Sequence, residues 1–181
     1  NEYIARAANK EDDCTGHFWE GRFKSQALLD ESALAACMAY VDLNPVRAKL
    51  AKTPEESGYT SIKYRVQAAK AGKKPKRLMP FMAKPNQEMA SSLPFTFVDY
   101  LQLIDASSRT LQPNKRGSVE QDLPLVLTRL NIELEQWLNL TTQFERRFKH
   151  AAGRLINLER YALNQNLKRI HGRQNALRLL G

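Results

Sequence analysis

The chain is poor in the residues that form disulfides or hold transition metals. Its 181 residues include two cysteines, Cys14 and Cys37, and three histidines. Neither cysteine belongs to a C-x-x-C pair, so we expect no disulfide framework and no zinc site. Cys37 falls on the apolar side of an expected helix, where a buried thiol behaves as a small hydrophobic group. Both cysteines fit the reducing cytoplasm, where we place the protein.

Long apolar runs are also missing. No run approaches the roughly 20 residues of a membrane-spanning helix, and the opening NEYIARAANKEDD does not resemble a signal peptide. We therefore expect no membrane partner. Hydrophobic residues make up 43% of the chain, which is enough for globular packing. The chain begins without methionine, and we expect it to be a fragment or a processed product.

Acidic residues are absent from one segment and scarce in another. Residues 63–84 hold eight lysines and arginines and no acid, and residues 143–181 hold nine against two glutamates. The net charge of +9 is thus concentrated in two segments on a mildly acidic body. This pattern favours a polyanion such as nucleic acid as partner. A solvated surface that keeps the protein soluble is the alternative.

The first part of the chain predicts a strand, a helix and a second, short helix in succession. Residues 16–29 alternate as in a strand with one packed face and one polar face, which carries Arg22 and Lys24. Asp30 then caps an expected helix, whose buried stripe we assign from its larger apolar residues: Leu34, Cys37, Met38 and Val41. Asn44 and Pro45 end that helix and open a short one.

The remaining chain predicts a linker followed by helices. Residues 72–94 are basic, rich in proline and without period, as in a linker or an extended arm. Beyond them we expect a helix capped by Thr96, two shorter helices, and a long helix from about residue 141 to 169. We therefore divide the chain into 1–71, 72–94 and 95–181.

Tyr40 and Asn44 stand four residues apart, so a helix places them on the same side, at the margin of the expected stripe. A half-buried tyrosine with a wet hydroxyl is the ordinary explanation for such a position. The functional alternative is a phenolic nucleophile that attacks a DNA phosphate and holds the strand covalently. An asparagine oxygen beside it is a suitable ligand for Mg²⁺ or Mn²⁺.

The segment FWEGRFKSQALLDESALAACMAYVDLNPVRAKLAKTPEESGYTSI, residues 18–62, resembles part of a known catalytic domain. The family is that of the HUH-superfamily tyrosine transposases, in their insertion-sequence-200-like and REP-associated branch. The similarity lies first in a W-x-x-R-F strand, matched by Trp19, Arg22 and Phe23. A segment Y-[IV]-x-x-N-P-[VL]-R-A follows, matched by residues 40–48, and then Pro54, Tyr59 and Ser61 occur in the order of the family's proline, tyrosine and serine. Residues 93–119 and 144–148 resemble the helical extension of the longer members.

The resemblance implies a role for each matching residue. Tyr40 would cleave single-stranded DNA and form a 5′-phosphotyrosine, Asn44 would complete a Mg²⁺ or Mn²⁺ site, and Arg47 would contact DNA or brace the helix end. It implies an α+β fold: a partial ferredoxin-like transposase domain, made of a strand and the tyrosine helix, followed by a mainly α-helical domain. It also implies a homodimer acting on single-stranded or hairpin DNA.

One feature of the family is missing. Its metal is held mainly by a His-x-His pair, and His17, His150 and His171 do not form one. We therefore expect this chain alone to bind no metal and to be inactive. With one evident strand, three possibilities stay open: the missing half lies outside this chain, the strand pairs between copies, or the protein rearranges into a mainly helical form.

The basic segments supply the remaining candidate site residues. Single-stranded DNA favours a basic groove with aromatic rings. With Arg22, Lys24 and Arg47, the expected DNA contacts are Lys63, Arg65, Lys73, Lys74, Lys76, Arg77, Arg146, Arg147 and Lys149. A solvated linker is the alternative for the first segment. A basic helical module that binds DNA without chemistry, or a decayed transposase remnant, is the alternative for the whole chain.

Overall fold

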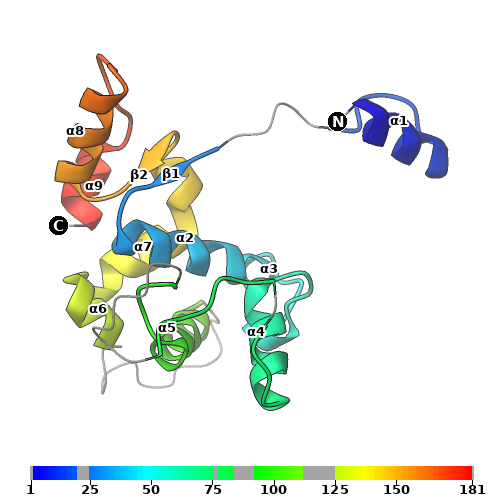
Figure 1. Ribbon diagram of the computed structural model, residues 1–181, viewed down its shortest axis with the longest axis horizontal. Coiled ribbons are helices and arrows are strands. Elements are labelled where there is room, and N and C mark those ends of the chain that lie inside the picture. The colour runs from blue at the N-terminus through cyan, green and yellow to red at the C-terminus, as the bar shows by residue number, and fades with distance from the viewer. Residues whose placement is uncertain (1, 20–24, 76, 84–91, 112–124, 181) are drawn as a thin grey trace.

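The computed structural model describes residues 2–19, 25–75, 77–83, 92–111 and 125–180. Across these ranges the chain is mainly helical, with one small sheet (Figure 1). Its elements are α1 (Glu2–Glu11), β1 (Ala27–Leu28), α2 (Glu31–Asp42), α3 (Asn44–Arg47), a 3-10 turn (Pro54–Glu56), α4 (Ser61–Lys70), α5 (Phe97–Thr110), α6 (Leu125–Leu130), α7 (Leu134–Arg147), β2 (Ala151–Ala152), α8 (Leu155–Asn164) and α9 (Arg173–Leu179). This agrees with the broad α+β class. In the described ranges, no helix combines the length and apolar character that crossing a bilayer requires.

The small sheet joins two distant parts of the sequence. β1 runs parallel to β2, and the backbone N–H of Leu29 donates a 2.9 Å hydrogen bond to the carbonyl of Ala152. Of the strand expected over 16–29, the described residues pair at Ala27 and Leu28, and residues 20–24 lie outside the described ranges. The partner strand comes from the C-terminal region, where we had expected continuous helix.

Helix α2 packs on α7 (Figure 1), and the side chains that α2 buries are small. Its fully buried apolar residues are Ala33, Ala35, Ala36 and Ala39. The predicted stripe is wrong at Val41, which is 53% exposed, and its other three members are only half-buried. The physical reason is that alanine lets a neighbouring helix approach closely, so the contact face follows the small residues.

Helix α7 lies at the centre of the core. Its buried side chains Trp137, Leu140 and Phe144 belong to one hydrophobic cluster that also includes residues of α2, α4, α5, α8 and α9. The indole Nε1–H of Trp137 donates a 2.8 Å hydrogen bond to the hydroxyl of Ser107, which ties α7 to α5. The segments 1–71 and 95–181 thus share this core, and their division into domains stays a prediction.

The long helix expected over 141–169 is wrong, because α7 ends at Arg147 and α8 begins at Leu155. Asp30 contacts the start of the new helix. Its Oδ1 caps α2 by accepting from the backbone N–H of Ala33 at 2.9 Å, as expected. Its Oδ2 accepts from the backbone N–H of Arg154 at 2.6 Å, just before α8. One carboxylate therefore caps α2 and holds the residue that precedes α8.

The described part of the segment 72–94 folds against α5. Phe81 forms an isolated bridge with Leu93, and the N–H of Leu93 donates a 2.7 Å hydrogen bond to the carbonyl of Pro80. The ring of Phe81 contacts those of Phe97 and Tyr100 at centroid distances of 5.2 and 5.4 Å. These residues are therefore part of the packed structure, while residues 84–91 lie outside the described ranges.

Candidate functional site

Tyr40 lies on the last turn of α2, where that helix faces α7. Its ring is half-buried and lies 6.2 Å from the ring of Phe144, centroid to centroid. Its hydroxyl is in an exposed position and donates a 3.4 Å hydrogen bond to Oε2 of Glu145. The packing of α2 on α7 thus fixes the ring and leaves the phenolic oxygen at the surface, beside a carboxylate that sequence spacing does not connect to it.

Arg47, at the end of α3, holds three elements together. Its guanidinium carbon lies 4.2 Å from the centroid of the Tyr40 ring, which is a cation–π contact. One terminal nitrogen donates a 2.7 Å hydrogen bond to the carbonyl of Thr141 in α7. The other donates a 2.7 Å hydrogen bond to Oδ1 of Asn44. Arg47 therefore braces the helix end, one of the two roles that the resemblance implied.

The predicted metal ligand Asn44 does not fit a divalent cation in this arrangement. Its side-chain oxygen accepts from the Arg47 guanidinium, so a positive charge occupies the position that Mg²⁺ would need. The described residues contain no cluster of three or more histidines, cysteines, aspartates or glutamates that could hold a metal. Asn44 alone supplies too few ligands for useful affinity.

Asp42, in the same motif, is the centre of a buried polar network that the sequence did not reveal. It is 1% exposed and accepts hydrogen bonds from the hydroxyl of Tyr100 at 2.7 Å and from the N–H of Ile62 at 3.2 Å. Burial raises the pKa of Asp42, and these hydrogen bonds and Arg65 oppose the shift. Burial, together with the neighbouring Asp42, raises the pKa of Tyr100 well above its ordinary value.

Arg65 does not lie on the surface, contrary to its predicted role as a phosphate contact. It is 5% exposed and donates a 3.0 Å hydrogen bond to the carbonyl of Met79. Its guanidinium carbon lies 4.5 Å from the centroid of the Phe81 ring. Burial lowers the pKa of the guanidinium, and the charge of Asp42 opposes that shift. The prediction is wrong because the Arg65 guanidinium packs inward, beside the buried Asp42 carboxylate.

The other predicted DNA contacts fall into two groups around α4 and around the end of α7. In the first group, Lys73, Lys74 and Arg77 are exposed and Lys63 is half-buried. In the second group, Arg146 and Lys149 are exposed. Arg147 is half-buried, and its Nε–H donates a 3.1 Å hydrogen bond to the side chain of Asn139. Arg22, Lys24 and Lys76 lie outside the described residues.

No family model, curated protein or solved structure matches this chain. The features that bear on function are therefore the geometry around Tyr40, the exposed cations and the sequence resemblance. Two functional candidates escaped sequence analysis. Glu145 is 105 residues from Tyr40, and no local pattern links the two. Phe97 looked like an ordinary residue of the first helical turn, yet it lines a hollow beside the lysines of the first group.

Proposed function

We propose that this chain is the tyrosine-bearing part of a DNA transposase, in which Tyr40 attacks a phosphate of single-stranded DNA. The observation that supports the proposal is the exposed Tyr40 hydroxyl, which lies 3.4 Å from Oε2 of Glu145 on a ring that the Arg47 guanidinium covers. Tyrosine ordinarily titrates near pH 10, so the attack needs a group that takes the proton. Glu145 is placed to accept it.

The proposed step transfers a DNA phosphate from a 3′ oxygen to the Tyr40 oxygen. The Tyr40 oxygen bonds to phosphorus, the bond from phosphorus to the 3′ oxygen breaks, and that oxygen leaves as a hydroxyl after taking a proton from water. The Tyr40 proton passes to the Glu145 carboxylate. The products are a 5′-phosphotyrosine and a free 3′ end, and the covalent bond keeps the strand ready for rejoining.

The wider proposal follows the resemblance. In the intact enzyme we expect Mg²⁺ or Mn²⁺ to be required, a ferredoxin-like sheet to carry the tyrosine helix, and a homodimer to act on single-stranded or hairpin DNA in the cytoplasm. The described residues do not fit the cation, so we expect this chain alone to form no adduct.

The test uses the protein translated from its whole reading frame, incubated with radiolabelled single-stranded DNA and Mg²⁺. We expect a covalent protein–DNA adduct on a denaturing gel, and its loss in Tyr40→Phe. Tyr59→Phe is the matched control, because Tyr59 is fully exposed and takes no part in the contacts described for Tyr40. An adduct that survives in Tyr40→Phe would contradict the assignment of the nucleophile.

The second candidate is a basic module that binds DNA without chemistry. It is favoured by the contacts of Arg47, which holds the Asn44 oxygen and covers the Tyr40 ring. In this case DNA binding weakens steeply with salt, Tyr40→Phe leaves it unchanged, and no adduct forms in Mg²⁺. The same gel, run beside a salt titration of binding, separates the two candidates.

A further inference from the structure

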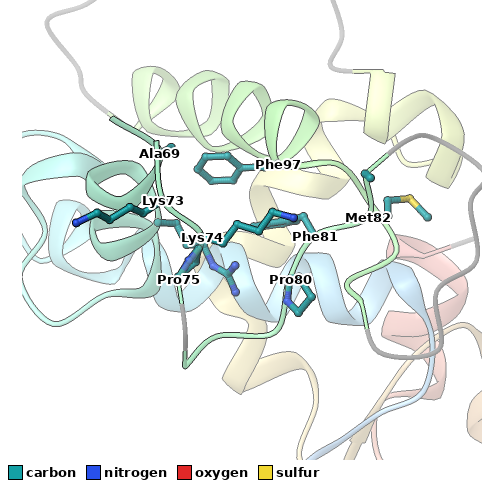
Figure 2. A pocket seen from close by; sticks show the side chains of 10 residues that line it. Ala69, Lys73, Lys74, Pro75, Pro80, Phe81, Met82 and Phe97 are labelled. Carbon is teal, nitrogen blue, oxygen red and sulfur yellow. The ribbon is translucent and has the colours of Figure 1, made fainter. Parts of the chain in front are cut away.

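A hollow lies between the C-terminal end of α4 and the start of α5. It has a volume of about 260 Å³, and its lining includes the half-buried rings of Phe81 and Phe97 and the exposed Lys73 and Lys74. Figure 2 shows Lys74 extending between Phe97 and Pro80, while Lys73 points the opposite way. Because drug-sized ligands occupy about 300–1,000 Å³, this hollow suits a single flat ring.

The rings of the hollow are held in place from behind. Phe81 contacts Phe95 and Tyr100 at centroid distances of 5.8 and 5.4 Å, and the Arg65 guanidinium covers it at 4.5 Å. Phe97 leans on Phe81 at 5.2 Å. A ring fixed by such contacts loses little freedom when a ligand stacks on it, which favours binding.

A second hollow shares the two lysines. It is lined by Lys73, Lys74, Gln67, Ala68 and Tyr64, and the Tyr64 side chain is 47% exposed. The lysine pair therefore borders two recesses, each with an aromatic ring. Alternation of aromatic rings with cations matches the alternation of bases with phosphates along a single strand.

We propose that the hollow at Phe97 takes one unpaired base of single-stranded DNA, with the flanking phosphates on Lys73 and Lys74. This inference rests on the proposed function, since it names how that function holds its strand. It assigns sequence-tolerant stacking to Phe97 and charge neutralisation to the lysine pair. Tyr64 offers the neighbouring base a second ring.

The test compares two fluorescein-labelled strands by anisotropy: twelve thymidines, and an abasic strand with the same number of phosphates. Stacking contributes about 1–3 kcal/mol per base, so we expect the thymidine strand to bind at least about fivefold more tightly. Phe97→Leu should weaken binding of the thymidine strand about tenfold and leave binding of the abasic strand unchanged. Val98→Leu is the matched control, because Val98 is the adjacent residue and is 62% exposed.

A second variant tests the lysines without touching the core. Lys73→Gln with Lys74→Gln should weaken the binding of both strands alike. The slope of the logarithm of the binding constant against the logarithm of salt concentration should become shallower by about 1.4, which is about 0.7 for each phosphate of a single strand. The control carries Lys49→Gln with Lys70→Gln, which removes the same charge from two exposed positions outside both hollows. We expect this control to keep the salt dependence of the wild type.

The outcomes separate the two proposals. Equal affinity of the wild type for both strands, or an unaltered Phe97→Leu variant, overturns the base site and leaves the proposed function standing. Failure of the wild type to bind either strand overturns both. If thymidine monophosphate binds as tightly as the strand, the base site is also overturned, because a free nucleotide would then be the ligand.

Discussion

The hydroxyl of Tyr100 donates a 2.7 Å hydrogen bond to the carboxylate of Asp42 inside the core. Tyr100 comes from α5 and Asp42 from the end of α2, and the same carboxylate accepts from Ser61 and Ile62 at the start of α4. One buried group thus connects the helix that carries Tyr40 with the two helices that border the Phe97 hollow. The relative position of the Tyr40 site and the Phe97 hollow depends on this connection.

Tyr100→Phe should destabilise the fold by about 1.5–3 kcal/mol, the usual value for a hydrogen bond to a charged group. The substitution removes only the hydroxyl and leaves a buried carboxylate with fewer donors. Urea unfolding followed by circular dichroism measures the change in the free energy of unfolding. Tyr64→Phe is the control, since Tyr64 is exposed, and we expect it to stay within about 0.5 kcal/mol of the wild type. A cost for Tyr100→Phe no larger than the control would argue against the network.

The pKa of Asp42 gives this network a pH dependence. Burial raises it above the ordinary value of 3.8, so the folded state holds the Asp42 proton more firmly than the unfolded state does. The resulting stabilisation is fully present below pH 3.8 and is lost as pH rises through the raised pKa. The free energy of unfolding of the wild type minus that of Asp42→Asn should therefore be more positive at acid pH than near neutrality. Urea unfolding across this pH window checks the sign, and a difference that grows with pH would refute it.

Local chemistry in the sequence predicted several elements correctly. The cap at Asp30 is present, and Thr96 caps α5 by accepting from the N–H of Asp99 at 3.2 Å. The short helix that starts at Asn44 also forms as expected. Each depends on contacts within a few residues, so the pattern contains the necessary information.

Contacts over long sequence separations were not predictable in the same way. β1 pairs with a strand more than 120 residues later, and a two-residue strand such as Ala151–Ala152 leaves no alternating pattern. The buried face of α2 follows alanines, which rank below leucine and valine in any count of hydrophobicity. Arg65 points inward because Asp42 is buried nearby, and that burial depends on α5. Tertiary packing decides all three features.

Gly153→Ala should destabilise the fold by about 1–3 kcal/mol through overpacking. A Cβ at this position would lie 2.8 Å from Oδ2 of Asp30 and 2.9 Å from Cβ of Leu29. The carboxylate can move only by weakening its hydrogen bond to the backbone of Arg154. Gly58→Ala is the control, because an added Cβ at Gly58 meets nothing within 4 Å. Comparable midpoints in urea for the two variants would show that Asp30 and Gly153 are not packed as described.

Arg47→Met tests whether the residues around Tyr40 form a structural clamp. Methionine keeps much of the apolar stem but removes the hydrogen bond to the Thr141 carbonyl and the charge over the Tyr40 ring. A hydrogen bond from a charged donor is worth about 1.5–3 kcal/mol and an exposed cation–π contact about 0.5–1 kcal/mol, so we expect a loss of about 2–4 kcal/mol.

Two controls complete the Arg47 experiment. Arg146→Met removes an exposed arginine of α7 and should cost less than about 0.5 kcal/mol. Asn44→Ala should cost similarly little, because Asn44 is exposed and Arg47 keeps its bond to Thr141. Thermal unfolding of the three variants beside the wild type ranks these costs. If Asn44→Ala proved as damaging as Arg47→Met, the bond between Asn44 and Arg47, rather than the contact of Arg47 with α7, would be what holds the tyrosine helix in place.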